Sequence, residues 1–323
     1  MKKLLITGWI PEDIIKDYDK TFSITMPDQK KNNFSLEEVM EMLPEYDGLF
    51  TLSAFPFRKN LIDLGVNLKA VANFGVGYDN IDWEYCSEKG IFVLNTPSSV
   101  TEPTAELTIG LILAVTKGIV LYDRDLRKTR QCRTPAFFDR DLLLSGKTIG
   151  IIGYGRIGQA VGKKAQGLGM KVMYHNRHRK SPEEEKRLGA VYGSFEEVLE
   201  KADIISCHIP YTRENHHLFN REAFRRMKPT AYFINAARGP VMCEADLVTA
   251  LKEKWIRGAA SDVFEFEPDV SRELADMENV VITPHIGTNI LEARKAMARE
   301  ALNGLAGLFQ GKKPVNVVNK ELF

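Results

Sequence analysis

Short apolar runs alternate with segments of helical spacing along the first hundred residues. Four runs bounded by turn residues are expected to be buried strands: LLIT (4–7), GLFTL (48–52), LKAVANF (68–74) and GIFVLNT (90–96). Two segments between them, SLEEVMEML and NLIDLG, have helical spacing. Because strands that alternate with helices are typical of βαβ units, the pattern predicts a small domain with a parallel sheet over residues 1–98.

A long apolar segment follows, from Thr104 to Lys128. Pro103 suits the first turn of a helix, where its missing N–H costs nothing. At 1.5 Å per residue, one helix over this segment would be ~40 Å long. Its middle is apolar on nearly every face, so it must be covered on more than one side. Burial within one subunit would satisfy this, but we favour burial partly against a second copy and therefore expect a homodimer.

A second, longer alternation begins near residue 148. Its strand candidates are TIGIIG, KVMYH, DIISCHIP, AYFINAA, GAASDVF and NVVITPHIG. A helical segment lies between each neighbouring pair of the first five candidates, and LEARKAMAREALNGLAGLFQG is predicted to form the last helix. This regular alternation is the doubly wound pattern. The chain is therefore predicted to be α/β, with two doubly wound parallel sheets.

Composition narrows the class of protein. The chain has 323 residues, with 44 Lys and Arg against 43 Asp and Glu, a net charge of +1. That balance argues against a nucleic-acid binder and gives no reason to expect attraction to a membrane. The four cysteines, at positions 86, 132, 207 and 243, include no CxxC pair, so neither a metal site nor a disulfide framework is expected. A reducing cytoplasm is the expected location.

The strongest single motif is the glycine fingerprint at residues 153–158, which reads G-Y-G-R-I-G. It follows a predicted strand and opens a predicted helix, which is the context that gives it meaning. Gly153 permits a tight turn, Gly155 lets the backbone approach a pyrophosphate, and Gly158 lets helix and strand pack closely. Three structural glycines in a tight turn are the alternative. We expect a dinucleotide at the positive end of this helix.

The end of the next strand selects between the two nicotinamide cofactors. A carboxylate is usual there in NAD enzymes, because it binds the ribose 2′-hydroxyl. Here the position is held by Asn176, and Arg177 and Arg179 follow. A neutral amide does not repel a 2′-phosphate, and a guanidinium binds phosphate well, so NADP is predicted as the preferred cofactor with NAD as the alternative. Otherwise both arginines are simply solvated surface charges.

Polar residues end the later strands: Arg238 in INAARG, Asp262 and Glu267 in SDVFEFEP, and His285 in TPHIG. Taken with NFGVGYDNID, PTAEL and GKTIGIIGYGRIG, in this order, these motifs make the chain resemble the D-isomer-specific 2-hydroxyacid dehydrogenases over almost its whole length. The resemblance places the family's substrate-binding arginine on Arg238, its acid partner on Glu267 and its proton donor on His285. The YHNR segment resembles the glyoxylate/hydroxypyruvate reductase branch.

The residue types agree with that chemistry. Reduction of a 2-keto acid needs hydride at C2, which the cofactor supplies, and a proton on the carbonyl oxygen. A histidine is a suitable general acid near neutral pH, and Glu267 would favour its charged form and hold its orientation. Arg238 can grip carboxylate and carbonyl oxygens together. Each residue alone could be structural; the three together beside a dinucleotide fingerprint indicate catalysis.

The resemblance also implies binding positions. Substrate would contact the backbone of Val76 and Gly77 and the loop at Ser53 and Ala54, in addition to Arg238 and His285. His208 resembles a cofactor-lining histidine, with a core role as the alternative, and Asp262 resembles the acid near the nicotinamide amide. The full expected cofactor set is Thr104, Gly153, Tyr154, Gly155, Arg156, Ile157, Gly158, Asn176, Arg177, His208, Pro210, Asn215, Ala236, Ala237, Arg238, Asp262, His285 and Gly287.

The resemblance further implies the domain organisation. Residues 1–98 and 289–323 would form a flavodoxin-like substrate-binding domain, and residues 99–288 a dinucleotide-binding Rossmann domain inserted in it. Two crossings near residues 99 and 288 would act as a hinge beside the active site.

The leading function is therefore reduction of glyoxylate, hydroxypyruvate or a similar acid to a D-2-hydroxy acid. The alternatives are a reductase of larger acids such as phenylpyruvate, and a nucleotide-sensing binding protein of the same fold.

Overall fold

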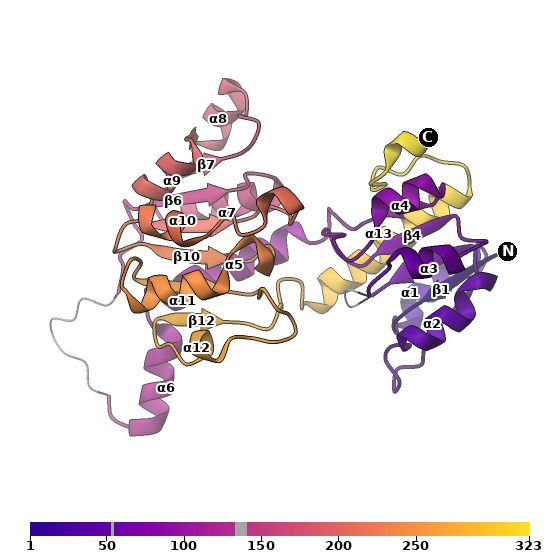
Figure 1. Cartoon of the computed structure of the whole chain (residues 1–323), viewed down its shortest axis with the longest axis horizontal. Helices are drawn as coiled ribbons and strands as arrows, with labels where there is room; N and C mark the ends of the chain where they lie inside the picture. Colours follow the sequence, from indigo (N-terminus) through magenta and orange to yellow (C-terminus); the bar gives the residue numbers. More distant parts are fainter. Residues whose placement is uncertain (53–54, 133–140) are drawn as a thin grey trace. The chain divides into compact units, whose positions relative to one another are not determined.

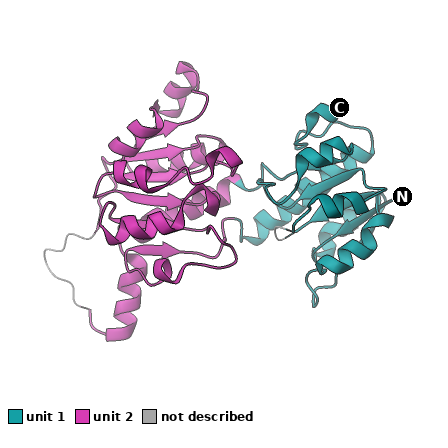
Figure 2. Cartoon of the chain, viewed as in Figure 1, with its two compact units in different colours: residues 1–100, 288–323 teal, residues 101–287 magenta. Residues whose placement is uncertain are grey.

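The computed structural model describes residues 1–52, 55–132 and 141–323. Contacts divide the chain into two compact units (Figure 2). Unit 1 comprises Met1–Val100 and Thr288–Phe323, and unit 2 comprises Thr101–Gly287. Each unit is built on a parallel sheet with helices on both faces, which confirms the predicted fold class.

The described part of unit 1 has a five-stranded sheet in the order β2-β1-β3-β4-β5 (Figure 1). The direction of winding reverses between β1 and β3, as in flavodoxin-like folds. The strands are β1 (Lys2–Ile6), β2 (Phe22–Thr25), β3 (Gly48–Thr51), β4 (Ala70–Asn73) and β5 (Phe92–Leu94). The central strands are buried on both faces, which explains their unbroken apolar sequence.

Helices of unit 1 cover the two faces of this sheet. One face packs against α1 (Glu12–Ile15) and the long α13 (Leu291–Phe309). The other packs against α2 (Leu36–Met42), α3 (Lys59–Leu64) and α4 (Trp83–Glu88). Short 3₁₀ turns complete the unit: η1 (Lys16–Tyr18), η2 (Leu43–Glu45) and η5 (Lys320–Leu322).

The sheet of unit 2 has seven strands in the order β12-β11-β10-β9-β6-β7-β8 (Figure 1). Winding reverses between β6 and β9, and a crevice for a ligand opens at such a switch point. The strands are β6 (Thr148–Ile152), β7 (Lys171–His175), β8 (Ala190–Tyr192), β9 (Ile204–Cys207), β10 (Tyr232–Asn235), β11 (Gly258–Ser261) and β12 (Val280–Ile282).

Helices of unit 2 form two layers. One face of the sheet carries α5 (Thr101–Thr116) and α7 (Arg156–Gly167), with α8 (Pro182–Leu188) at its edge. The other carries α9 (Phe195–Lys201), α10 (Arg221–Arg226), α11 (Glu244–Lys252) and α12 (Arg272–Ala275). The 3₁₀ turns η3 (Arg213–Asn215) and η4 (Gly239–Val241) follow β9 and β10.

The expectation of one continuous helix from Thr104 to Lys128 is wrong. The chain bends by 57° between α5 and α6 (Ile119–Thr129). Gly118 lies at the bend with φ +59, a left-handed conformation that glycine adopts without steric cost. Among the described helices, none is long and apolar enough by itself to cross a membrane. Only the bent pair of α5 and α6, counted together, reaches the length and apolar composition of a membrane span.

Candidate active site

Three neighbouring strands of unit 2 end side by side. The last residues of β10, β11 and β12 pair with one another across the sheet. Arg238, Glu267 and His285 lie in the loops that follow these strands. Because the carboxyl ends of parallel strands meet at one edge, the fold brings these loops together from separate parts of the sequence.

His285 and Glu267 form a direct pair. Nδ1 of His285 lies 3.0 Å from Oε2 of Glu267, and both side chains are partly exposed. The other carboxylate oxygen of Glu267 accepts a hydrogen bond of 2.9 Å from the backbone N–H of Phe264. The carboxylate is therefore held from one side by the backbone and orients the ring through Nδ1 from the other.

The environment of Glu267 favours its charged form. Partial burial raises the pKa of Glu267, but the hydrogen bonds from His285 and Phe264 and the charges of His285 and Arg238 outweigh it, so the pKa lies below its ordinary value. The residue is thus a carboxylate at neutral pH. A charged partner stabilises an imidazolium, the form of histidine that can donate a proton.

Asp262 holds the loop that carries His285. It is buried, and its carboxylate accepts hydrogen bonds from Thr283 Oγ1 at 2.6 Å and from the backbone N–H groups of Ile286 and Gly287 at 2.8 and 2.9 Å. His285 itself adopts φ +51 and donates its backbone N–H to the Asp262 carbonyl. Burial raises the pKa of Asp262, and these bonds only partly offset that effect.

Arg238 is placed by contacts of the backbone that sequence reasoning missed. The side chain of Asn235 accepts from the N–H of Ala237 and donates to the carbonyl of Arg238, at 3.1 and 3.0 Å. A Cβ at Gly239 would lie 1.8 Å from the carbonyl oxygen of Phe264. Only glycine allows this close approach, which draws the loop after β10 against the loop that leads to Glu267. The signal was present as Asn and Gly within INAARG, but the partner segment is remote in sequence.

The glycine fingerprint has the shape of a phosphate cradle. Gly153 has φ +96, and a Cβ there would meet the His208 carbonyl oxygen at 2.6 Å. A Cβ at Gly158 would meet the Gly153 carbonyl oxygen at 2.3 Å, which shows how closely α7 lies on the turn. By contrast, nothing lies within 4 Å of a Cβ at Gly155, the residue that precedes the helix. This open space at a helix N-terminus fits a pyrophosphate.

The neighbouring positions Tyr154, Arg156 and Ile157 complete this turn and the start of α7. The Tyr154 N–H donates to Oδ1 of Asn176 at 2.6 Å, so the amide that replaces the usual carboxylate is tied to the cradle. Arg156 is exposed, whereas Tyr154 is buried against Tyr174.

The two arginines beyond β7 are not equivalent. Arg179 donates two hydrogen bonds of 2.9 and 2.8 Å to the carboxylate of Glu185. These bonds, together with one from Tyr174, lower the pKa of Glu185 to about 2. Arg177 is exposed and meets only the exposed Glu214, at 3.5 Å, among its described ion-pair partners. Arg177 is therefore the arginine free to take a new anionic partner.

Other predicted cofactor positions fall around the switch point. His208 follows β9 and donates its backbone N–H to the last residue of β6 at 2.7 Å. Its ring Nε2 lies 2.8 Å from Ser206 Oγ, whereas the buried Nδ1 has no hydrogen-bond partner among the described residues. Burial lowers the pKa of His208 to about 4.

Asn215 and Pro210 belong to one tight loop, in which the Asn215 amide donates to the Pro210 carbonyl at 2.6 Å. The Asn215 side chain also accepts a hydrogen bond from the backbone N–H of Thr212. Both of these hydrogen bonds stabilise the loop itself. Ala236 and Ala237 lie in the turn before Arg238 and are partly exposed.

Thr104, Gly287 and Asp262 meet at one place. A Cβ at Gly287 would lie 3.4 Å from Oδ2 of Asp262 and 3.5 Å from Oγ1 of Thr104. The first turn of α5 thus reaches the loop after β12, although about 180 residues separate them in sequence.

The predicted substrate positions of unit 1 form their own local structure. The carbonyl of Val76 accepts from the Asn95 side chain at 2.8 Å, and that of Gly77 accepts from the Asn73 side chain at 2.5 Å. Two asparagines at strand ends therefore shape the loop. Ser53 and Ala54 lie outside the described residues.

Comparisons with known proteins identify the relatives of this chain. Residues 109–287 match the model of the D-isomer-specific 2-hydroxyacid dehydrogenase NAD-binding domain. The chain is 41% identical to the glyoxylate reductase of Thermococcus litoralis, over 99% of this chain and 97% of that protein.

Solved structures agree. A glyoxylate reductase from Paecilomyes thermophila matches with a TM-score of 0.90 at 26% identity, covering 99% of both chains. An NADPH-dependent glyoxylate/hydroxypyruvate reductase from Sinorhizobium meliloti, in complex with NADP and malonate, matches with a TM-score of 0.86 at 29% identity, covering 100% of this chain and 98% of that one.

Proposed function

Because the chain belongs to the D-isomer-specific 2-hydroxyacid dehydrogenase family, we propose that it reduces the C2 carbonyl of a small 2-keto acid to a D-2-hydroxy acid. Glyoxylate and hydroxypyruvate are the proposed substrates, since relatives at 41% and 29% identity are named for one or both of them. The observation that carries the proposal is the His285–Glu267 pair, 3.0 Å apart, in loops that neighbour the Arg238 loop at one edge of the sheet.

We assign the chemical roles as follows. A nicotinamide dinucleotide, when bound along the fingerprint at residues 153–158, supplies the hydride. The Arg238 guanidinium binds the substrate carboxylate and polarises the carbonyl oxygen. His285 donates a proton from Nε2 to that oxygen and its ring becomes neutral, while Glu267 holds the orientation of the ring through Nδ1. Asp262 is a positioning residue, because it holds the backbone around His285.

A panel of 2-keto acids tests the substrate class. We expect turnover, followed by the loss of nicotinamide absorbance, to be fastest with glyoxylate or hydroxypyruvate. Faster turnover of phenylpyruvate would move the assignment to a reductase of larger acids. Tight binding of the dinucleotide with no turnover of any acid would overturn the enzymatic proposal in favour of a nucleotide-sensing binding protein.

We further propose that NADPH is the preferred cofactor and that Arg177 recognises its 2′-phosphate. Asn176 brings no negative charge to this position, and Arg177 is exposed, with its only described ion pair at 3.5 Å. Arg179 is a weaker candidate because Glu185 already holds its guanidinium with two hydrogen bonds.

Substitution Arg177→Gln tests this assignment. Charge-assisted bonds to a phosphate are worth about 1.5–3 kcal/mol, so kcat/KM for NADPH should fall roughly 10- to 100-fold while that for NADH changes little. The matched variant Arg179→Gln should leave the ratio of the two cofactors nearly unchanged. An unmodified enzyme that favours NADH would contradict the preference itself.

The remaining assignments rest on the sequence and the resemblance. We propose that unit 2 is the dinucleotide-binding domain and unit 1 the substrate-binding domain, with Val76 and Gly77 among its contacts. A cytoplasmic location and a homodimeric assembly complete the proposal. Support for the dimer comes from α6, on which Ile119 and Val120 are about half exposed.

A further inference from the structure

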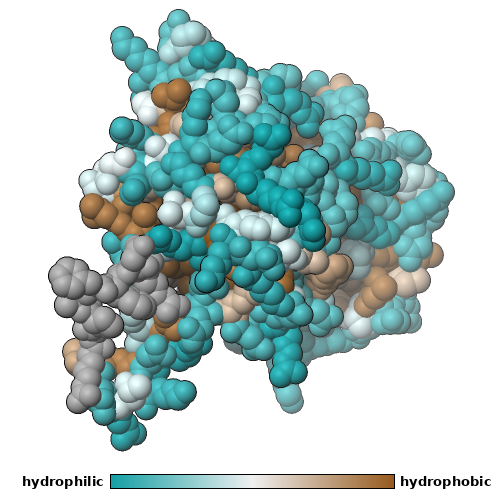
Figure 3. Space-filling model, turned by 60° about the vertical axis from the view of Figure 1, so that its left-hand side comes forward, coloured by the Kyte–Doolittle hydropathy of each residue, from teal (hydrophilic) through white to brown (hydrophobic). Residues whose placement is uncertain are grey.

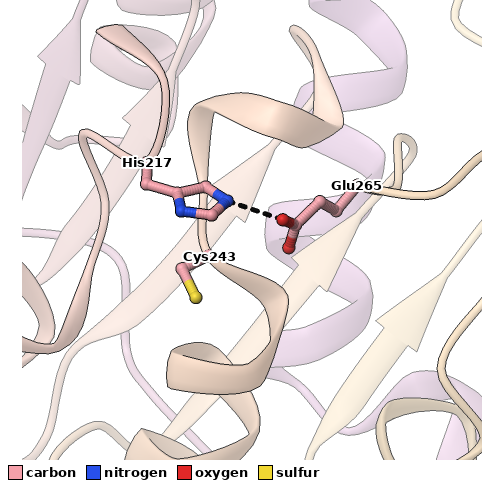
Figure 4. Close-up of side chains that lie close together, drawn as sticks. All are labelled: His217, Cys243 and Glu265. Carbon is pink, nitrogen blue, oxygen red and sulfur yellow. Dashed lines mark hydrogen bonds and ion pairs between the residues drawn. The ribbon is translucent and has the colours of Figure 1, made fainter.

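A second group of chemically reactive side chains lies in unit 2, apart from the residues assigned to catalysis. His217 comes from the loop after η3, Cys243 immediately precedes α11, and Glu265 lies in the loop after β11 (Figure 4). Their ligand atoms all lie within 4.8 Å of one another, and the three residues are partly buried. Nε2 of His217 is 2.6 Å from Oε1 of Glu265.

The backbone holds these side chains in place. Phe219 and Met242 form a parallel bridge, and the N–H of Cys243 donates to the Phe219 carbonyl at 2.9 Å, so the segments with His217 and Cys243 run side by side. Oε2 of Glu265 accepts the N–H of Glu244 at 2.8 Å, which leaves Oε1 to face the histidine. Fixed outer contacts of this kind orient the ligands of a metal ion before it binds.

An imidazole, a thiolate and a carboxylate are together the ligand types of zinc. The two anionic groups balance the charge of a divalent ion, and a set of three protein ligands leaves a fourth position for water. Bonds of about 2.0–2.3 Å in a tetrahedral site separate the ligand atoms by about 3.3–3.8 Å. To close on an ion, the widest separation, at most 4.8 Å, must contract by about 1 Å, and the pair of His217 Nε2 and Glu265 Oε1, 2.6 Å apart, must open by about 0.7 Å. The histidine–carboxylate pair alone would tie the two loops together, and the Cys243 thiol, which is hydrogen-bonded to Asp246, must exchange that partner for the ion.

We propose that His217, Cys243 and Glu265 form a binding site for a divalent transition-metal ion, with zinc as the preferred occupant and one coordination position open to solvent. The ion would join three segments, one of which continues directly from Glu265 to Glu267. It would thereby brace the loop that carries the carboxylate partner of His285, without contacting the reacting groups.

Cobalt is the probe for this site, because thiolate ligation gives it a charge-transfer absorption band and tetrahedral coordination gives it strong visible bands. The protein should first carry Cys132→Ser, since Cys132 is the exposed thiol and Cys86 and Cys207 are buried. We expect one cobalt ion per chain with both bands, displaced by one equivalent of zinc. A protein that shows no thiolate band at any cobalt concentration overturns the proposal.

Ligand variants assign the site. Cys243→Ser should abolish the thiolate band, and His217→Gln and Glu265→Gln should each weaken cobalt binding at least 10-fold. His178→Gln, at an exposed histidine elsewhere in unit 2, is the matched control and should bind as tightly as the parent. A thiolate band that survives Cys243→Ser would refute the site. Circular dichroism of each metal-free variant separates a lost ligand from a lost fold, and none of these readouts depends on reductase activity.

Discussion

At the residue scale, the pair of His285 and Glu267 is the centre of the proposed chemistry. The carboxylate is held by the backbone of Phe264, and its lowered pKa keeps it charged through neutral pH. This fixed carboxylate holds Nδ1 of His285 at 3.0 Å and so sets the orientation of the ring.

Substitution Glu267→Gln should therefore change both the rate and its pH dependence. The glutamine keeps the size of the side chain but removes the charge, so kcat/KM should fall on the order of 100-fold, and the loss of rate at low pH that accompanies protonation of Glu267 should disappear. Steady-state kinetics between pH 5 and pH 9 measure both effects. Asp269→Asn, at an exposed carboxylate on the same loop, is the control; an equal loss there would show that general loop charge, not the pair, is responsible.

His208 allows a prediction about stability. In the unfolded chain a histidine binds a proton below its ordinary pKa of about 6.5, whereas in the folded protein burial lowers the pKa of His208 to about 4. The unfolded state therefore binds more protons between these values, and the free energy of unfolding must decrease as the pH falls from 6.5 toward 4. Above this window the contribution of His208 is fully present.

Urea unfolding at pH 7 and pH 5 measures this linkage. Of the difference in the free energy of unfolding between the two pH values, about 2 kcal/mol should be due to His208. In the variant His208→Gln that part should vanish, whatever the variant's stability at pH 7. If the variant and the parent lose the same free energy between the two pH values, His208 titrates normally in the folded protein.

At the scale of elements, the turn between β6 and α7 contains glycines for two different physical reasons. Gly158 is needed so that the helix can approach the Gly153 carbonyl, whereas nothing lies within 4 Å of a Cβ at Gly155, where we propose that a ligand approaches the backbone. The first reason is packing and the second is binding, although both residues belong to one motif.

Alanine substitutions should separate the two reasons. At Gly158 the new methyl group would lie 2.3 Å from a backbone oxygen, so the free energy of unfolding should fall by about 1–3 kcal/mol. At Gly155 the methyl group meets open space, so stability should change little while the Kd for NADPH rises at least 10-fold. Gly167→Ala, in open space at the end of the same helix, should alter neither property. Unaltered NADPH binding by Gly155→Ala would place the pyrophosphate elsewhere.

Helices α5 and α6 show how one residue divides a helical pattern. Seven side chains of α5 are buried, including Leu111 and Ile112, whereas α6 buries only Leu121 among its described side chains. The bend at Gly118 directs α6 away from the packed layer of unit 2 (Figure 1). The exposed apolar side chains on α6, Ile119, Val120 and Leu126, stand among the charged residues of that helix.

At the scale of the whole molecule, α6 is the proposed dimer contact. Ile119, Val120 and Leu126 are about half exposed, and Leu143 is more exposed still. Apolar patches are visible on the face of unit 2 that Figure 3 brings forward. Exposed apolar side chains of this kind are the candidates for an interface between protein subunits.

Light scattering of the purified protein should give twice the mass of one chain at micromolar concentration. Val120→Lys should convert this dimer to a monomer, because it places a charge in an apolar interface. Val66→Lys, at an exposed valine of unit 1, should leave the mass unchanged. A monomeric parent protein would exclude the homodimer, and a Val120→Lys variant that stays dimeric would move the interface away from α6.

Local patterns in the sequence were sufficient for the α/β class, the two parallel sheets and the glycine turn. Strands buried on both faces require unbroken apolar runs, and a tight turn below a helix requires glycine, so both leave a direct trace in neighbouring residues. The family motifs also predicted Arg238, Glu267 and His285 as site residues, because each motif follows a strand, and their catalytic roles stay predictions.

The tertiary structure decided what depends on partners that are remote in the chain. Gly118 ended a helix that the apolar pattern alone would continue, Glu185 formed two hydrogen bonds with the Arg179 guanidinium, and Phe264 explained why Gly239 must be glycine. The grouping of His217, Cys243 and Glu265 has the same origin. The spacing of residues in the sequence does not predict such contacts, because they form only when the fold brings separate segments of the chain together.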